Sequence, residues 1–276
     1  QVIRSIYGFS ANNIWAVGAG GLAMRYNGQT WTAVNSTTSN TLNSVWGSSA
    51  NDVWAVGDNR TIIRYNGTAW AAQPLGAPKL QHLQGVWGSS AIDVWIVGTS
   101  TDAQENHVAR FINNAEIGSI VLSATAPAVV PPFFTVWGTS AQSVWIGGQG
   151  VAYSLSDSGT SLSYMAYPMS TIVRSIWGSR ANDVYAVGDG GSLQHFNGTA
   201  YSAAGPGTTQ DLQSVWGVDD KDVWVVGNQG TVLRFDGTNW TAPPSGTKNP
   251  LNTVWGVNST NVWAGGNGGS ILHTLK

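Results

Sequence analysis

The sequence predicts an all-β fold, a seven-bladed β-propeller of four-stranded antiparallel blades. Three observations lead to this fold class. A motif of the type S-V-W-G recurs seven times at a period near 40 residues, each copy holds four short β-like segments, and no stretch has a helical period. Four-stranded units repeated in this way and closed into a ring form a propeller. An open β-solenoid is the alternative architecture, and it would need capping ends that the sequence does not show.

The copies are defined by two aromatic positions. The first aromatic stands at Tyr7, Trp46, Trp87, Trp137, Trp177, Trp216 and Trp255, and the second follows eight residues later, at Trp15, Trp54, Trp95, Trp145, Tyr185, Trp224 and Trp263. We therefore expect residues 1–276 to form a single domain, with copies at about 1–40, 41–81, 82–131, 132–171, 172–210, 211–249 and 250–276.

Copy two shows the four expected strands in order, as "LNSVWG", "DVWAVG", "TIIRYNG" and "TAWAAQ". The segments "SSAN" and "DNR" and an Asn-Gly pair separate them. Asn-Gly or Asp-Gly between two β-segments is a strong hairpin indication, and it recurs at Asn27-Gly28, Asn66-Gly67, Asn197-Gly198 and Asp236-Gly237. We expect both residues of each pair to adopt positive φ.

The last copy is incomplete. Copy one begins at Ile3, inside its first strand, and copy seven ends at Lys276, at the end of its third strand. The sequence therefore predicts a last blade that lacks its fourth strand, and 27 strands in place of 28. The exposed edge is expected to be covered by a flanking segment or by a neighbouring chain, because proteins rarely leave an edge strand bare.

Repetition also explains the tryptophans. All 15 occupy repeat positions, in the first, second or fourth strand, so we interpret them as packing between blades. Arg25, Arg64 and Arg234 lie ten residues after a second-strand tryptophan, and we expect each to stack on that ring. A repeated aspartate opens the second strand, as at Asp52, and we interpret it as an Asx turn.

The unit "SVWGSSANDVWAVGD…TIIRYNGTAW" resembles the tandem repeats of secreted and cell-surface bacterial propellers, particularly the large exoproteins of myxobacteria. The hairpin "RFDGTNW", from Arg234 to Trp240, is distantly similar to the Asp-box of sialidases and of photosystem II assembly-factor propellers. Arg234 stands where the Asp-box has a serine, and the only glutamates are Glu105 and Glu116, so no sialidase catalytic residue carries over. The resemblance implies a secreted or cell-surface protein.

Composition excludes several functions. Only 9% of the residues are charged and the net charge is −2, which does not fit a nucleic-acid binder. The chain has no cysteine, its four histidines lack metal-ligand spacing, and no apolar segment is long enough to cross a membrane. We therefore expect no cofactor, no metal, no membrane insertion and no enzymatic activity.

The candidate binding residues lie where the first strands begin, near the expected channel axis. The position three before the first aromatic is polar in six copies of seven, and its occupants are Arg4, Asn43, Gln84, Phe134, Arg174, Gln213 and Asn252. We expect them to ring the channel mouth. A solvated channel lining is the alternative interpretation.

Copies three and four depart most from the repeat. The loop 99–107 contains Asp102 and Glu105, and the link 123–134 and the segment "SDSGTSLSYMAYP" are also irregular. Loops between second and third strands and links between copies should open on the same face, so we expect the working face there. The aromatics Phe133, Phe134, Tyr164 and Tyr167 either belong to that surface or repack copy four.

The function expected from these features is a non-catalytic binding module that recognises a glycan or a surface protein at one face. A structural or adhesive scaffold within a larger exoprotein, with no small ligand, is the alternative. A glycoside-cleaving enzyme would need two carboxylates across a cleft, and only Asp102 and Glu105 lie close together outside the repeat.

Overall fold

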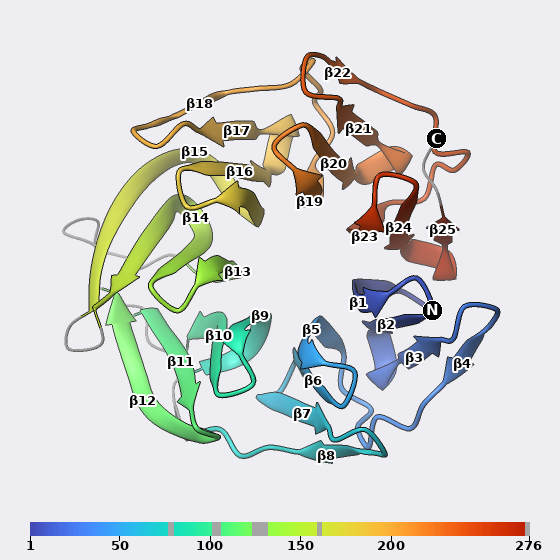
Figure 1. Cartoon of the computed structure of the whole chain (residues 1–276), viewed down its shortest axis with the longest axis vertical. Coiled ribbons are helices and arrows are strands. Elements are labelled where there is room, and N and C mark those ends of the chain that lie inside the picture. The colour runs from blue at the N-terminus through green and yellow to red at the C-terminus, as the bar shows by residue number, and fades with distance from the viewer. Residues whose placement is uncertain (77–79, 101–105, 123–131, 159–161, 274–276) are drawn as a thin grey trace.

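The structure, a computed structural model, describes the chain except residues 77–79, 101–105, 123–131, 159–161 and 274–276. It is a β-propeller, in which antiparallel sheets stand around a central channel and each chain copy runs from the channel outward (Figure 1). Among the described residues, no helix has the length and apolar character needed to cross a membrane.

Four sheets have four strands each. The first holds β1 (Ile3–Ser10), β2 (Asn13–Gly18), β3 (Ala23–Tyr26) and β4 (Trp31–Ala33). The second holds β5 (Leu42–Ser49), β6 (Asp52–Gly57), β7 (Thr61–Tyr65) and β8 (Trp70–Ala72). The third holds β9 (Leu80–Ser90), β10 (Asp93–Ser100), β11 (Asn106–Ile112) and β12 (Ala115–Leu122). Copy six forms β19 (Leu212–Asp219), β20 (Asp222–Gly227), β21 (Val232–Phe235) and β22 (Trp240–Thr241).

Copies four and five share one six-stranded sheet. Its strands are β13 (Phe133–Ser140), β14 (Ser143–Asp157), β15 (Leu162–Arg180), β16 (Asp183–Gly188), β17 (Leu193–Phe196) and β18 (Tyr201–Ala203). Strand β15 has 19 residues, and it pairs with β14 through its first part and with β16 through its second.

The expectation of seven separate four-stranded blades is therefore wrong: hydrogen bonding defines six sheets. The physical reason lies in the segment 162–172, "LSYMAYPMSTI". Other copies place Gly, Pro, Asn and Ser between the fourth strand and the next first strand, and these residues end strands. This segment keeps Pro168 and two serines but has no Gly or Asn, and Pro168 pairs beside an irregularity in the ladder. Tyr164, Tyr167 and Ile172 favour β-structure, so one strand continues from copy four into copy five.

The last sheet has three strands, as expected, among the residues described: β23 (Leu251–Asn258), β24 (Asn261–Gly266) and β25 (Ile271–His273). The described residues form 25 strands and not the expected 27, because β14 and β15 are each continuous over the length of two expected strands. Where the structure describes the loops between second and third strands, four of them are 3₁₀ turns: η1 (Ala19–Gly21), η2 (Asp189–Gly191), η3 (Asn228–Gly230) and η4 (Asn267–Gly269).

The Asn-Gly hairpins differ from the expected turn. Gly28 has φ 96° and Gly67 has φ 95°, but the preceding asparagines have no positive φ. Instead, Oδ1 of Asn66 accepts hydrogen bonds from the backbone N–H groups of Thr68 and Ala69, both at 3.0 Å. The asparagine thus stabilises a four-residue turn through its side chain.

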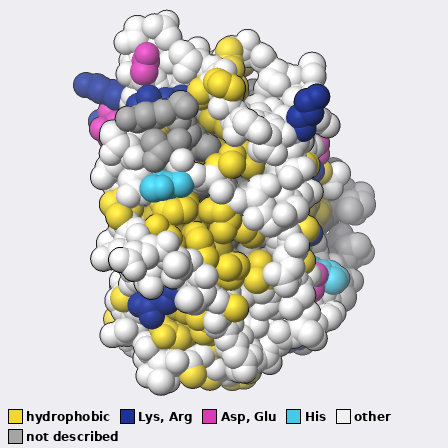
Figure 2. All heavy atoms as spheres, turned by 90° about the vertical axis from the view of Figure 1, so that its right-hand side faces the viewer, with side chains coloured by type: hydrophobic (Ala, Val, Ile, Leu, Met, Phe, Trp, Pro, Cys, Tyr) yellow, Lys and Arg dark blue, Asp and Glu magenta, His cyan; other side chains and the backbone are white. Residues whose placement is uncertain are grey.

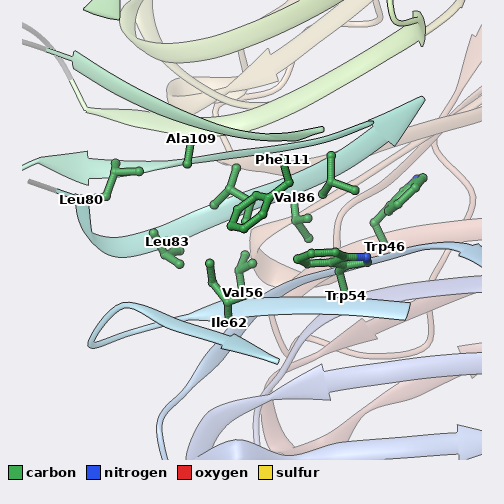
Figure 3. Packing of buried hydrophobic residues seen from close by; sticks show 11 residues of the cluster. Trp46, Trp54, Val56, Ile62, Leu80, Leu83, Val86, Ala109 and Phe111 are labelled. Atoms are coloured by element: carbon green, nitrogen blue, oxygen red, sulfur yellow. The ribbon is translucent and has the colours of Figure 1, made fainter. Parts of the chain in front are cut away.

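Apolar side chains fill the seams between neighbouring copies. Figure 3 shows the seam between copies two and three, where Trp54 and Val56 of one copy face Leu83 and Phe111 of the next. Trp54 is 1% exposed, and its ring centroid lies 5.4 Å from that of Phe111. Burial of this kind, repeated around the ring, is the main stabilising term of the fold.

Copies one and seven close the ring. The backbone N–H of Ile6 donates to Oγ1 of Thr253 at 3.1 Å, and Nδ2 of Asn252 donates to the carbonyl of Ile3 at 2.7 Å. Trp263 packs between the two copies, with its centroid 4.9 Å from Tyr26 and 5.8 Å from Trp31. The first and last sheets therefore meet through side chains, and each keeps its own strands.

Candidate binding site at the channel mouth

First strands from all seven copies line the central channel. Its cavity, about 330 Å³, is bordered by the first-strand aromatics and by the residues one and two positions before them, such as Ser5, Ile6 and Tyr7. Burial raises the pKa of the Tyr7 phenol to about 12. The channel walls are thus aromatic and hydroxyl-bearing, and the phenol stays neutral near neutral pH.

The structure brings the seven predicted ring residues together at one end of this channel. They enclose a cavity of about 150 Å³, lined by Arg4, Asn43, Gln84, Phe134, Arg174, Gln213 and Asn252. Each is the residue three before a first-strand aromatic, so the ring follows from the register of the first strands, which lie innermost in the propeller (Figure 1). Polar groups converging on a small cavity are typical of ligand sites.

Two of the ring amides are held on both sides. Nδ2 of Asn43 donates to Oδ1 of Asp58 at 3.1 Å and to the carbonyl of Leu83 in the next copy at 3.0 Å. Nδ2 of Asn252 makes the equivalent bonds to Oδ1 of Asn267, at 3.0 Å, and to Ile3. These bonds fix the orientation of both amides. No described residue donates to their oxygens, which can accept from a ligand.

The ring rests on a second set of residues that the sequence reasoning missed. In copies one, two, five, six and seven, the residue 15 positions after the ring residue begins the turn between the second and third strands, and in four of these copies it contacts the ring residue. Arg174 forms an ion pair with Asp189, and Nε2 of Gln213 donates to Oδ1 of Asn228 at 3.2 Å. The constant offset of 15, read together with the polar types at both positions, is the signal that could have found this set.

Arg4 differs from the other ring residues. In copy one Ala19 stands at the position of Asp58 and Asp189, and within the described ranges the Arg4 side chain has no hydrogen bond or ion pair. Arg4 is also exposed. The mouth thus carries one neutralised arginine, Arg174, and one arginine whose five donors face solvent.

The two predicted acids, Asp102 and Glu105, lie outside the described residues, as does most of the link 123–134. The four irregular aromatic residues of copy four fall into two groups, one buried in the fold and one at the surface. Phe133 is fully buried, and Tyr167 stacks on Trp145 with centroids 5.5 Å apart. Tyr164 is 42% exposed, and Phe134 lines the mouth. Repacking of copy four therefore accounts for Phe133 and Tyr167.

A wider groove lies on the same face, over copy six. It measures about 660 Å³ and lies between the links 206–208 and 242–248, with Leu233 and Gln229 on its walls and Pro243 and Pro244 among its apolar contacts. The sequence reasoning placed the working face over copies three and four and missed this groove. The Pro- and Gly-containing links "GPGTT" and "PPSGTK" are the signal that was available.

The recurrent arginines have structural roles. The guanidinium carbon lies 4.9 Å from the ring of Trp54 for Arg64, 5.5 Å from Trp15 for Arg25 and 4.8 Å from Trp224 for Arg234, so the predicted stacking is confirmed. The aspartate has another role than the Asx turn. Oδ1 of Asp52 accepts from Nε of Arg64, and its Oδ2 accepts from the hydroxyl of Ser48, both at 2.5 Å.

In the described part of the chain, no group of three or more His, Asp or Glu side chains is placed to hold a metal ion. The acids beside the mouth, Asp58 and Asp189, are engaged by ring residues. Among the described residues of the mouth, the arrangement offers fixed hydrogen-bond groups and one cation without a partner, Arg4, which suits the binding of a ligand.

Comparisons with known proteins agree with this fold. No protein-family model matches the chain, and no curated protein matches it. Among solved structures, YCF48 from Cyanidioschyzon merolae is similar with a TM-score of 0.76 and 17% identity, over 99% of this chain and 95% of that one. A structure of YCF48 bound to D1 peptide has a TM-score of 0.74 and 13% identity, over 100% and 92%.

The WD40 repeats of RRP9 are similar with a TM-score of 0.79 and 10% identity, over 100% of this chain and 94% of that one. At these identities the likeness shows the β-propeller fold. The bacterial exoprotein and Asp-box resemblance, the extracellular location and the absence of catalysis stay predictions.

Proposed function

We propose that this protein is a non-catalytic binding module that holds a segment of a partner protein at the channel mouth, with a carboxylate of that segment bound to Arg4. The observation that carries the proposal is the guanidinium of Arg4, which has no partner among the described residues. The ring residues Asn43, Arg174, Gln213 and Asn252 are each held by a neighbouring side chain. A planar guanidinium binds a carboxylate through two parallel hydrogen bonds.

The dimensions and chemistry of the mouth favour a chain segment as the ligand. A cavity of about 150 Å³ admits one side chain or a chain end, while the rest of the segment lies across the face. Phe134 offers an apolar contact, and the oxygens of Asn43 and Asn252 can accept backbone N–H groups. The peptide complex of YCF48 supports this choice, because it shows that a propeller of similar fold binds a peptide.

A peptide library with free C-termini, selected on the wild-type chain, tests the proposal. We expect selected peptides to carry an Asp, a Glu or a free terminal carboxylate, to bind more weakly at high salt, and to lose at least about tenfold in affinity with Arg4→Ala. Arg180→Ala is the matched control. Arg180 is 62% exposed and lies at the other end of its first strand, so binding should be unchanged.

Conversion of the peptide carboxylate to an amide should reproduce the effect of Arg4→Ala. Equal binding by wild type and Arg4→Ala would overturn the proposal. If a glycan array gives specific binding and the peptide library gives none, the ligand is a sugar and the proposed class is wrong.

A further inference from the structure

Strand β22 leaves β21 one residue earlier than the fourth strands of copies one, two and five leave their third strands. In those copies the residue after the fourth strand donates its backbone N–H to a carbonyl of the third strand at 2.9 Å: Val34 to Ala23, Gln73 to Ile62 and Ala204 to Leu193. In copy six this residue is Pro243, which has no N–H. Val232 takes the position of Ala23, and no residue of the described chain donates to its carbonyl.

This carbonyl faces the groove over copy six. In the register of the complete copies it points to the side of the fourth strand, and on that side Ala242 and Pro243 line the groove. The side chain of Val232 is buried and packs toward copy seven, and that of Leu233 is buried and packs toward copy five. Both residues therefore offer main chain to the groove. A backbone acceptor without a partner is a place where a bound chain can donate an N–H.

We propose that this groove holds the part of the partner segment that adjoins the carboxylate bound to Arg4. The segment is extended, donates one backbone N–H to the carbonyl of Val232, and carries an acidic side chain that pairs with Lys248. An extended chain fits because its N–H groups point to alternate sides, so one of them faces the strand while its neighbours face away. This inference rests on the proposed function.

The groove leads to the channel mouth. On one wall, Gln229 directly follows the residue that accepts a hydrogen bond from the ring residue Gln213. On the other wall, Lys248 stands four residues before the ring residue Asn252, so their Cα atoms are at most about 14 Å apart. Asn252 in turn donates to the carbonyl of the residue before Arg4. A segment that leaves the groove therefore reaches Arg4 by crossing Asn252.

The charge at the groove favours an acidic segment. Lys248 lines it, is exposed, and has no ion pair within the described ranges. Charged side chains are sparse in this protein, and on the side that Figure 2 shows they stand as separate groups among neutral and hydrophobic atoms, so a single lysine sets the local charge. The acid of the neighbouring link, Asp211, is engaged: it accepts from the N–H of Gly190 at 2.8 Å and from Nδ2 of Asn228 at 3.1 Å.

Substitution Pro243→Val tests the groove without weakening the fold. It gives copy six the residue that copy one has at Val34, and it supplies the N–H that the carbonyl of Val232 lacks. We expect a Tm equal to or above that of wild type, and binding of the peptides selected on wild type to weaken at least about tenfold. Pro250→Ala is the matched control. It removes a proline from the same link outside the groove lining, so binding should be unchanged.

The same peptides report on the hydrogen bond directly. On addition of peptide, the ¹³C resonance of the Val232 carbonyl should shift, and that of Ile62, which already accepts from Gln73, should stay. N-methylation along the peptide should weaken binding at one residue beside the carboxylate-bearing end and be tolerated at its two neighbours.

A pair of lysines tests the charge. Lys248→Ala should weaken binding at least about threefold and reduce its dependence on salt. Lys221→Ala should have no effect, because Lys221 lies between first and second strands, at the opposite face.

The outcomes separate this inference from the proposed function. Peptides that depend on Arg4 but bind wild type and Pro243→Val equally would overturn the groove and keep the mouth. Peptides that lose binding in Pro243→Val and keep it in Arg4→Ala would support the groove and overturn the mouth. If no peptide is selected, both proposals are wrong. If Pro243→Val does not fold, an unmoved Val232 carbonyl resonance in wild type still overturns the inference.

Discussion

The Trp46 indole lies against the backbone of Gly88 in the next copy, so closely that a Cβ added to Gly88 would stand 2.5 Å from Cη2 of the ring. The same relationship joins Trp87 to Gly138, Trp137 to Gly178, Trp177 to Gly217, Trp216 to Gly256 and Trp255 to Gly8. The glycine of the S-V-W-G motif therefore provides the space that the tryptophan of the preceding copy fills.

Substitution Gly88→Ala tests this relationship. We expect a loss of about 1–3 kcal/mol in the free energy of unfolding, because the extra methyl group overpacks a filled seam. Urea unfolding measures it. The variant Gly88→Ala with Trp46→Phe should recover part of the loss, and strictly additive effects of the two substitutions would show that the ring and the glycine do not interact.

Copy one shows what happens when the first aromatic is smaller. Tyr7 replaces tryptophan, and the ring of Phe9 takes the position against Gly47, with Cζ 2.6 Å from an added Cβ; the Tyr7 and Phe9 centroids are 5.5 Å apart. We expect Phe9→Ser to cost about 2 kcal/mol, less than a fully buried phenylalanine, because Phe9 is half-buried. Adding Tyr7→Trp, which restores the repeat, should return much of this stability in thermal melts. If Tyr7→Trp restores none of the lost stability, Phe9 does not substitute for the missing tryptophan in this seam.

These contacts show where sequence reasoning succeeds. The period of the aromatics predicts the propeller, the stacking of Arg64 on Trp54, and the meeting of Arg4 and Asn252 at one mouth, because all three depend only on strand register. The positions of Phe9 and Tyr167 depend on volumes in the neighbouring copy, so a period cannot give them. The partner of Asp52 also needed three dimensions, since Arg64 and Asp52 meet across two strands.

The prediction of seven separate sheets was wrong for a similar reason. A period of about 40 residues counts copies, and it does not show whether a strand is interrupted between them. The continuity of β15 is associated with residues 162–172, which contain no Gly or Asn and are rich in β-favouring residues, and this local composition could have been detected from the sequence.

Side-chain hydroxyl groups link neighbouring first strands by hydrogen bonds. Because these bonds are present at some seams and absent at others, we expect the seams to differ in stability. Oγ of Ser44 accepts from the N–H of Val86 at 3.2 Å, and the equivalent bonds link Ser5 to Val45, Ser175 to Val215, Ser214 to Val254 and Thr253 to Ile6. Gly85 occupies this position in copy three, and in the described structure neither Val136 nor Ile176 has such a bond. We expect the amides of Val136 and Ile176 to exchange hydrogen faster than that of Val86, as mass spectrometry or NMR can measure.

Removal of one hydroxyl should make a strong seam resemble a weak one. Ser44→Ala leaves the N–H of Val86 without its acceptor, and we expect a loss of about 1 kcal/mol and faster exchange at Val86. Ser44→Thr is the control, because Thr253 makes the same bond in copy seven. Unchanged exchange at Val86 in Ser44→Ala would contradict the assignment.

We expect the hairpin at Asp236 to make the free energy of unfolding depend on pH, unlike the hairpins that have asparagine at this position. The backbone N–H groups of Asn239 and Thr238 donate to its carboxylate, at 2.8 and 2.9 Å, and lower the pKa of Asp236. Since the pKa is lower in the folded state, its stabilising contribution is present above the ordinary pKa of about 4 and is lost as pH falls through the folded pKa. In Asp236→Asn, which copies the turn of Asn66, this dependence should be absent. NMR titration of wild type checks the direction, and a raised pKa would contradict it.

Arg110 joins copies three and four at the seam where the hydroxyl bond is missing. Its guanidinium is 8% exposed, donates from Nε to Asp93 of its own copy at 2.7 Å and from Nη1 to Asp157 of copy four at 2.5 Å, and lies 4.3 Å from the ring of Trp95. Asp157→Ala leaves a buried cation with one of its two anions, so we expect a loss of about 2–3 kcal/mol in unfolding free energy.

The matched control is Asn114→Gly, because Asn114 has φ 65° and glycine adopts this conformation without strain. Oδ1 of Asn114 accepts from Nη1 of Arg64 at 2.6 Å at the preceding seam, but this contact is exposed, and Ser44 also joins that seam. We expect this loss to be below about 1 kcal/mol. Hydrogen exchange in β13 should rise in Asp157→Ala and stay unchanged in Asn114→Gly, because the first substitution removes an ionic link between copies three and four and the second does not. Equal effects of the two substitutions on stability would show that burial of Arg110 does not strengthen this seam.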